Sequence, residues 1–118
     1  MYEIKVKTHF SAAHNLVNYK GKCERLHGHN WVVETIFAYR AVAEDGLAID
    51  FHDAKRLVNE VIEKLDHSYL NDLAVLKKIN PTSENVARFI FDAVKARNTN
   101  VKSVSVWENE GSCATYYE

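Results

Sequence analysis

The opening of the chain alternates polar and apolar side chains, which is the two-residue period of a half-buried strand. Ile4 and Val6 share one parity, and this pattern predicts a strand that runs through Phe10. The stretch 31–39 is rich in β-branched and aromatic residues, which predicts a longer strand with apolar groups on both faces. Residues 11–30 then form a long connection between these two strands.

After a turn signal at 44–46, the apolar period changes to that of a helix, which we expect from about Asp53 to Leu65. Pro81 precedes Thr82-Ser83-Glu84, a helix start with hydroxyl caps and an early carboxylate. Alternation returns over 101–117 and predicts a hairpin of two further strands.

This order of elements predicts an α+β fold in which both helices lie on one face of a four-stranded sheet. A length of 118 residues fits a single domain that spans 1–118. The net charge is −1 and the basic residues are scattered, which argues against a nucleic-acid partner. The chain shows neither a signal-peptide pattern nor an apolar run of membrane-spanning length, so we expect no membrane partner and a cytoplasmic setting.

Three histidines, His14, His27 and His29, are the candidate metal ligands. A catalytic Zn²⁺ takes three protein ligands and keeps a fourth position open. His27 and His29 are two residues apart, so in an extended segment both side chains leave the same face. The alternative is that His-Gly-His is a polar turn and that His14 is an unrelated surface residue.

The two cysteines of the chain have different surroundings in the sequence. Cys23 precedes His27 by four residues, and a thiol near a dication loses its proton readily and can act as a base or nucleophile. Burial as a small apolar residue is its alternative. Cys113 falls in an apolar strand pattern, and we expect it to pack in the core.

For the other candidate site residues, the sequence is compatible with either a structural or a functional role. Asp66-His67 ends the first predicted helix, where a cation also interacts favourably with the helix dipole. Glu108 is either a buried carboxylate or the first exposed residue of the hairpin turn. His9 and His52 fit a strand residue and a helix start, respectively, rather than metal ligands.

In combination, these features resemble the 6-pyruvoyl-tetrahydropterin synthase and 6-carboxy-tetrahydropterin synthase family. The resemblance spans nearly the whole chain in the order of the family. The matching stretches are Phe10-Ser11-Ala12-Ala13-His14, Cys23 through His29, Leu65-Asp66-His67 with Tyr69-Leu70-Asn71-Asp72, Pro81-Thr82-Ser83-Glu84-Asn85, and Glu108.

The resemblance implies a tunnelling fold, in which antiparallel subunit sheets join edge to edge into a barrel with helices outside. A homohexamer built from two trimers is the usual form, with active sites at subunit interfaces. It also implies Zn²⁺ as cofactor. The implied roles are zinc ligation by His14, His27 and His29, a general base at Cys23, a proton relay at Asp66 and His67, a pterin anchor at Glu108, and pocket residues at Thr82, Ser83 and Glu84.

The implied substrate is dihydroneopterin triphosphate, and the product in the carboxy-forming branch is 6-carboxy-tetrahydropterin on the route to queuosine. The short spacing between Cys23 and His27 resembles this branch, whereas the pyruvoyl-forming enzymes place more residues there. Glu24 is the first residue of a second motif, Glu-x-x-His-Gly-His. This motif resembles a third branch of the family, which forms 6-hydroxymethyl-dihydropterin for folate. The sequence carries both motifs, so dual activity is also a hypothesis.

Two rivals belong to other classes. One is a zinc- or pterin-binding protein without turnover, although binding alone does not need Cys23 and His67. The other is a GTP cyclohydrolase type of tunnelling-fold enzyme, which is disfavoured by the presence of His-Gly-His and the absence of a longer N-terminal helical region.

Overall fold

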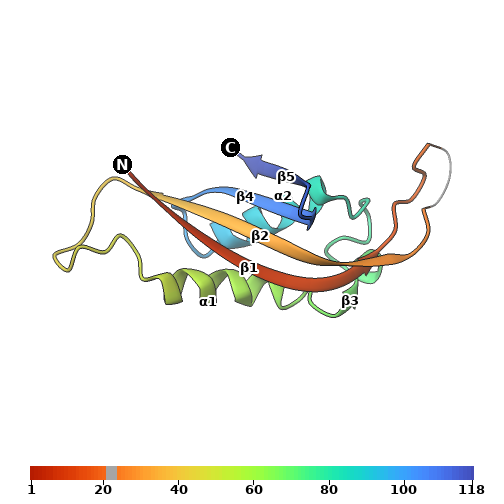
Figure 1. Cartoon of the computed structure of the whole chain (residues 1–118), viewed down its shortest axis with the longest axis horizontal. Coiled ribbons are helices and arrows are strands. Elements are labelled where there is room, and N and C mark those ends of the chain that lie inside the picture. Colours follow the sequence, from red (N-terminus) through yellow and green to blue (C-terminus); the bar gives the residue numbers. More distant parts are fainter. Residues whose placement is uncertain (21–23) are drawn as a thin grey trace.

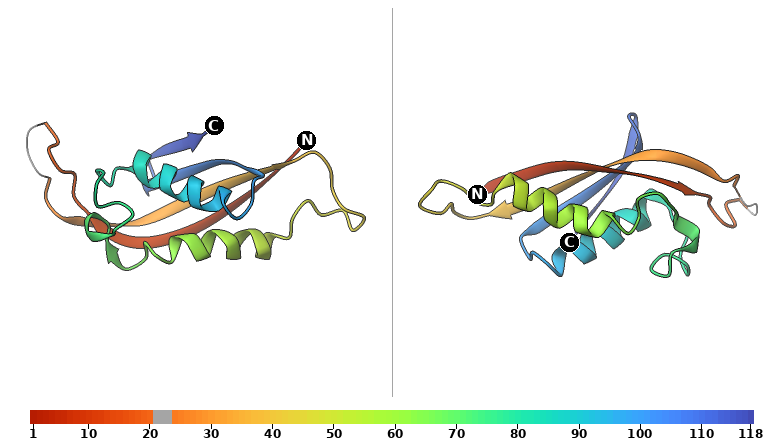
Figure 2. Two further views of the ribbon diagram at one scale, coloured as in Figure 1. Left: turned by 180° about the vertical axis from the view of Figure 1, so that it is seen from behind. Right: turned by 90° about the horizontal axis from the view of Figure 1, so that it is seen from below.

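A five-stranded sheet with two helices along one face builds the structure (Figures 1 and 2). The computed structural model describes residues 1–20 and 24–118. The strand order is β3-β1-β2-β4-β5. All neighbouring strands are antiparallel except β3, which runs parallel to β1. The elements are β1 (Tyr2–His14), β2 (His27–Tyr39), α1 (Phe51–Ile62), β3 (Ser68–Tyr69), the 3₁₀ helix η1 (Leu70–Asp72), α2 (Ser83–Lys95), β4 (Val101–Asn109) and β5 (Ser112–Tyr117).

Strands β1 and β2 are longer than the sequence pattern indicated. They pair from Tyr2 opposite Tyr39 to His14 opposite His27. The predicted end of the first strand at Phe10 was therefore wrong, and so was the long connection over 11–30. Alternation in fact continues to the end of β1, but its last buried position is a histidine, which an apolar pattern does not register.

The first helix begins and ends earlier than expected. Its N-cap is Asp50, whose carboxylate accepts a hydrogen bond from the backbone N–H of His52 at 2.7 Å. The apolar stripe of α1 is buried against the sheet face that carries β1 (Figure 2). Leu65 continues the apolar period, but it lies in the turn after α1 ends, where its side chain is still fully buried.

The second helix starts where the sequence predicted. The hydroxyl of Thr82 accepts a hydrogen bond from the backbone N–H of Asn85 at 3.2 Å, so Thr82 is the N-cap of α2. Val86, Ile90 and Val94 are fully buried along the face that meets β4 and β5. Both helices therefore cover the same side of the sheet, as expected (Figure 2).

The expectation of a four-stranded antiparallel sheet was wrong, because the sheet has a fifth strand, the short β3, which runs parallel to β1. Ser68 and Tyr69 pair with Ala12 and Ala13 of β1. The backbone N–H of His67 donates to the carbonyl of Ser11 at 2.6 Å and so starts this pairing. A strand of two residues is too short to leave any periodicity in the sequence.

The hairpin of β4 and β5 confirms two predicted strands but not the burial of Cys113. Cys113 pairs with Trp107, which in turn pairs with Val32 on the sheet face away from the helices. Its side chain is exposed. None of the helices in the described part of the chain is long and apolar enough to cross a membrane.

Replacing Ile90 by alanine should destabilise the fold strongly, because Ile90 is fully buried between α2 and the sheet. We expect a loss of about 2–5 kcal/mol in the free energy of unfolding, measured by urea denaturation. Ile79 is 45% exposed and provides the matched control, for which the loss should stay below about 0.5 kcal/mol. Equal losses at the two positions would contradict the placement of α2.

Candidate functional site

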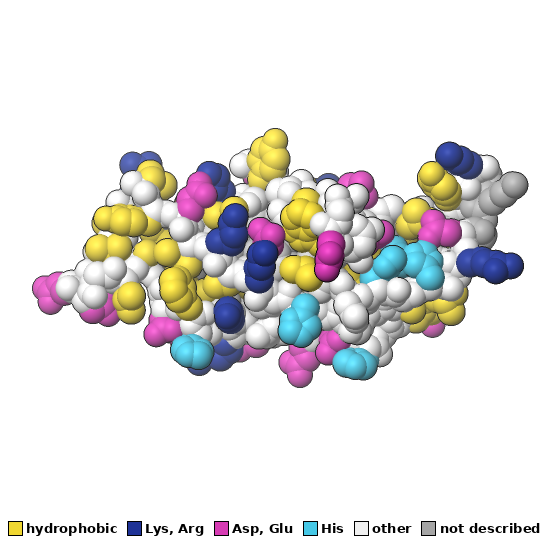
Figure 3. All heavy atoms as spheres, in the orientation of Figure 1, with side chains coloured by type: hydrophobic (Ala, Val, Ile, Leu, Met, Phe, Trp, Pro, Cys, Tyr) yellow, Lys and Arg dark blue, Asp and Glu magenta, His cyan; other side chains and the backbone are white. Residues whose placement is uncertain are grey.

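Three histidines lie together at one end of the two long strands. His14 ends β1 opposite His27, which begins β2, and His29 follows on the same face of β2. One ring nitrogen from each lies within 4.8 Å of the others. Figure 3 shows histidine side chains gathered toward the end of the molecule that carries the connection between β1 and β2. The polar-turn alternative is therefore wrong, because paired strands hold these residues.

Hydrogen bonds to the outer nitrogens orient two of these rings. Nδ1 of His14 lies 2.8 Å from the carbonyl oxygen of Pro81, and Nδ1 of His27 lies 2.8 Å from that of Arg25. A carbonyl oxygen only accepts hydrogen bonds, so each Nδ1 is the donor, and Nε2 is the ring nitrogen left to face a metal ion. Metal-binding histidines typically have this kind of outer partner.

Two inner nitrogens of the cluster have no hydrogen-bond partner among the described residues. Within the described residues, Nε2 of His14 and Nε2 of His29 are both buried and unpaired. Burial also lowers the pKa of His29 below its ordinary value, which favours the neutral ring. A buried nitrogen without a partner is costly, and a bound cation would satisfy both atoms. The three imidazoles thus fit a divalent transition metal.

The hydrophobic core supports the cluster from below. The ring of Trp31 meets His14 and His29 edge-on, with ring centroids 4.8 and 5.4 Å apart. Its Nε1–H donates to the carbonyl of Ala12 at 3.1 Å, and its other neighbour is the stacked ring of Phe10. Because Trp31 is fully buried, the imidazoles rest on a rigid surface.

Glu108 faces the histidine cluster from β4. Its carboxylate oxygens lie 4.0 Å from Nε2 of His14 and 3.8 Å from Nε2 of His29. The hydroxyl of Ser83 donates a hydrogen bond to the same carboxylate at 2.8 Å. Glu108 is therefore a half-buried strand residue beside the cluster, and not the first exposed residue of the hairpin turn.

A pocket of about 280 Å³ opens beside Glu108, between the start of α2 and β5. Thr82, Ser83 and Glu84 line it together with Glu108, so the structure brings four of the predicted substrate-binding residues to one place. Residues 112–114 of β5 form another part of the wall. No local sequence pattern indicates this wall, because the residues of β5 reach the pocket through the pairing of β4 with β5.

Glu24, the fifth predicted substrate-binding residue, does not line this pocket but lies beside His27. Its carboxylate is 3.3 Å from Nδ1 of His27. Its position therefore matches a partner of the metal site rather than a wall residue of the pocket. The predicted base Cys23 lies outside the described residues.

Asp66 and His67 lie apart from the cluster. The backbone N–H of Ser11 donates to the Asp66 carboxylate at 2.9 Å and holds the pKa of Asp66 below its usual range; His67 adds to this effect from 3.0 Å. The side chain of His67 is 82% exposed and lines a hollow with Gly28 and Ala13. Gly28 and Ala13 alternate with the three clustered histidines along the strands and so face the opposite side of the sheet, and His29 also lines this hollow.

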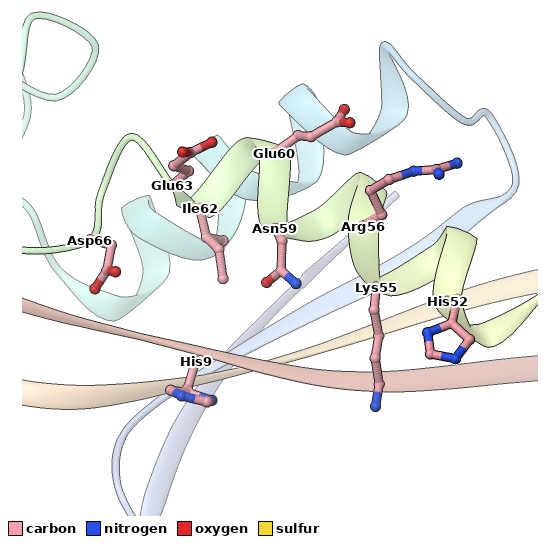
Figure 4. Close-up of a pocket in the computed structure, with 9 residues that line it drawn as sticks. All are labelled: His9, His52, Lys55, Arg56, Asn59, Glu60, Ile62, Glu63 and Asp66. Carbon is pink, nitrogen blue, oxygen red and sulfur yellow. The ribbon is translucent and has the colours of Figure 1, made fainter.

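His9 and His52 are confirmed as structural positions, in β1 and at the start of α1. Both lie along a groove of about 620 Å³ between β1 and α1, with Asp66 farther along it (Figure 4). Neither belongs to the three-histidine cluster.

Comparison with known proteins agrees with this geometry. The family model of 6-pyruvoyl tetrahydropterin synthase matches residues 3–118. The structure of 6-pyruvoyl tetrahydropterin synthase from Caenorhabditis elegans superimposes with a TM-score of 0.88 at 28% identity, over 99% of this chain and 95% of that one. The fold is thus the tunnelling fold, with the mixed sheet described above.

Curated proteins that are similar in sequence to this chain are named as enzymes that act on pterins. A putative 6-carboxy-5,6,7,8-tetrahydropterin synthase from Archaeoglobus fulgidus is 43% identical over 111 residues, covering 94% of this chain and 91% of the relative. A 6-carboxy-5,6,7,8-tetrahydropterin synthase from Haemophilus influenzae is 30% identical over the full length of both proteins. A dihydroneopterin monophosphate aldolase from Pyrococcus furiosus is 32% identical, covering 72% of each chain. This chain is therefore an enzyme of the lyase type, and it belongs to the 6-pyruvoyl tetrahydropterin synthase family.

Proposed function

We propose that the chain is a zinc-dependent 6-carboxy-tetrahydropterin synthase of the queuosine route. It would convert 7,8-dihydroneopterin triphosphate and water to 6-carboxy-5,6,7,8-tetrahydropterin, acetaldehyde and triphosphate in the cytoplasm. The observation that carries the proposal is the convergence of three imidazoles, of which His14 and His29 have Nε2 atoms that are buried and unpaired among the described residues. The names of the relatives from Archaeoglobus fulgidus and Haemophilus influenzae favour the carboxy-forming branch.

His14, His27 and His29 are the proposed zinc ligands. Three imidazoles leave a fourth position for substrate oxygen, which is the ligand count of catalytic zinc sites. When bound, zinc would act as a Lewis acid on the side-chain hydroxyls of the substrate. The protein contributes the three imidazole rings, of which His14 and His27 are held by the carbonyls of Pro81 and Arg25, respectively.

Glu108 is the proposed anchor for the pterin ring. A carboxylate accepts two parallel hydrogen bonds from the amino and ring N–H groups at the pterin edge. The hydroxyl of Ser83 fixes one carboxylate oxygen, and the pocket beside it offers room on the side of α2. Thr82 and Glu84 complete this part of the proposed pocket.

Cys23 is the proposed general base, and Asp66 with His67 is the proposed proton relay. Because the side chain of His67 is exposed and does not belong to the histidine cluster of its own chain, we propose that it serves the site of a neighbouring copy. The outer edge of β1 supports such an assembly, since among the described residues it pairs only with β3, at Ala12 and Ala13. The proposed form is a homohexamer of two trimers, in which residues 1–118 of each chain form one domain.

A second candidate is the folate-route branch that forms 6-hydroxymethyl-dihydropterin. The observation that favours it is the carboxylate of Glu24 next to His27, within reach of a metal-bound substrate. The Pyrococcus furiosus relative is named as an aldolase acting on a dihydroneopterin phosphate, which gives this candidate further support.

The product identifies the branch. Incubated with 7,8-dihydroneopterin triphosphate, the zinc-loaded protein should yield 6-carboxy-tetrahydropterin and acetaldehyde, detected by mass spectrometry. Cys23→Ala should abolish this product because the proposed base is lost, whereas Glu24→Ala should retain it. Glu44→Ala, in an exposed turn, is the control for loss of a carboxylate.

Formation of 6-hydroxymethyl-dihydropterin alone, lost in Glu24→Ala, would assign the chain to the folate branch. Both products from the wild type, each lost in a different variant, would show dual activity. Full activity of Cys23→Ala would exclude Cys23 as the base.

Glu108→Gln should weaken pterin binding about tenfold or more, because a hydrogen bond to a charged group contributes about 1.5–3 kcal/mol and the amide accepts through one oxygen only. Binding of a non-reactive pterin is measured by fluorescence titration of the zinc-loaded protein, with Glu44→Gln as the control. Zinc content should stay at the wild-type level. Unchanged pterin affinity would contradict the anchor role.

A further inference from the structure

The backbone that follows His14 is held by the side-chain amides of two asparagines. The backbone N–H of Asn15 donates to Oδ1 of Asn71 at 3.0 Å, and Nδ2 of Asn71 donates to the carbonyl of Asn15 at 2.8 Å. Asn80 binds Val17 in the same way, at 2.7 and 2.9 Å. Each amide thus replaces one residue of a neighbouring strand, because it supplies both a donor and an acceptor.

The residue between these two positions is bound from a different part of the chain. The carbonyl of Leu16 accepts a hydrogen bond from the backbone N–H of Glu24 at 2.9 Å. Glu24 begins the short stretch that leads to His27, the first ligand on β2. Residues 15–17 therefore connect the asparagine clamp, defined by Asn71 and Asn80, to both strands that carry metal ligands.

The clamp itself is firmly attached to the fold. Asn71 lies in η1, next to the fully buried Leu70. The carbonyl of Asn80 accepts hydrogen bonds from the backbone N–H of Thr82 at 2.8 Å and from Nδ2 of Asn85 at 2.7 Å. The next carbonyl along the chain, that of Pro81, holds Nδ1 of His14.

From this arrangement we infer that Asn71 and Asn80 are positioning residues of the metal centre, an inference that rests on the proposed zinc site. They fix the backbone of residues 15–17, and through it the position of His14 relative to His27. Three ligands must converge within a few tenths of an ångström to hold zinc well, so a small backbone shift lowers affinity. Val17 is exposed, so water can replace the lost hydrogen bonds at that position and the fold should survive.

Zinc affinity provides the test, because it does not depend on which pterin is the substrate. The zinc-loaded protein is titrated with a chromogenic zinc chelator, and the dissociation constant is compared for wild type, Asn71→Ala, Asn80→Ala and the double variant. Changes in the outer shell of zinc sites typically cost about 10–100-fold in affinity, and we expect a loss in this range for each alanine variant. Thermal unfolding of the metal-free proteins is recorded in parallel.

Asn98→Ala is the matched control. Oδ1 of Asn98 accepts from the backbone N–H of Asn100 at 2.9 Å and its Nδ2 donates to the hydroxyl of Tyr39 at 3.1 Å, near the end of β2 remote from the histidines. It should lose stability but keep wild-type zinc affinity. Asn80→Asp retains the acceptor and loses the donor, so it should fall between wild type and Asn80→Ala, and it replaces the alanine variant if that variant does not fold.

Zinc affinity in the clamp variants equal to that of Asn98→Ala would overturn the inference, even if their stability fell. A wild-type protein that binds no zinc would instead refute the proposed function on which the inference rests. The two failures are therefore distinguishable in one titration series.

Discussion

The register between β1 and β2 is the constraint on which the site depends. It places His14 directly opposite His27, and the two-residue period of the strands then brings His29 to the same face. A slip by one residue would turn His27 and His29 to the opposite side of the sheet, away from His14. The register is enforced far from the site, because the same parity carries Val33 and Phe37 into the core beneath the helices. Burial of apolar side chains thus sets the geometry of a polar site.

The start of α2 is the second organising element. Within five residues it supplies the carbonyl of Pro81 to His14, the hydroxyl of Ser83 to Glu108, and the side chain of Asn80 to the backbone of Val17. A helix N-terminus is well suited to this task, because its capping hydrogen bonds already fix the local backbone. The metal cluster, the proposed pterin anchor and the asparagine clamp therefore depend on one short segment. The proposed relay at His67 is independent of this segment.

Much of this arrangement follows from the sequence. The helix start at Thr82 and the grouping of His14, His27 and His29 were predicted, because capping chemistry and two-residue spacing act locally. The longer strands were missed because a histidine at a buried position does not look apolar. The short strand β3 and the exposure of Cys113 depend on pairing between distant segments, and no local pattern encodes that pairing. The clamp was missed for the same reason: Asn71 and Asn80 bind Asn15 and Val17 across more than 50 residues of chain.

In the proposed metal centre, three imidazoles hold the zinc ion without a thiolate. X-ray absorption at the zinc edge of the purified, zinc-loaded protein tests this ligand set directly, because nitrogen and sulfur ligands differ in distance and scattering strength. We expect a first shell of nitrogen and oxygen at about 2.0–2.1 Å, with the outer-shell scattering of three imidazole rings. A zinc–sulfur distance of about 2.3 Å would contradict it, because one of the two cysteines would then be a ligand.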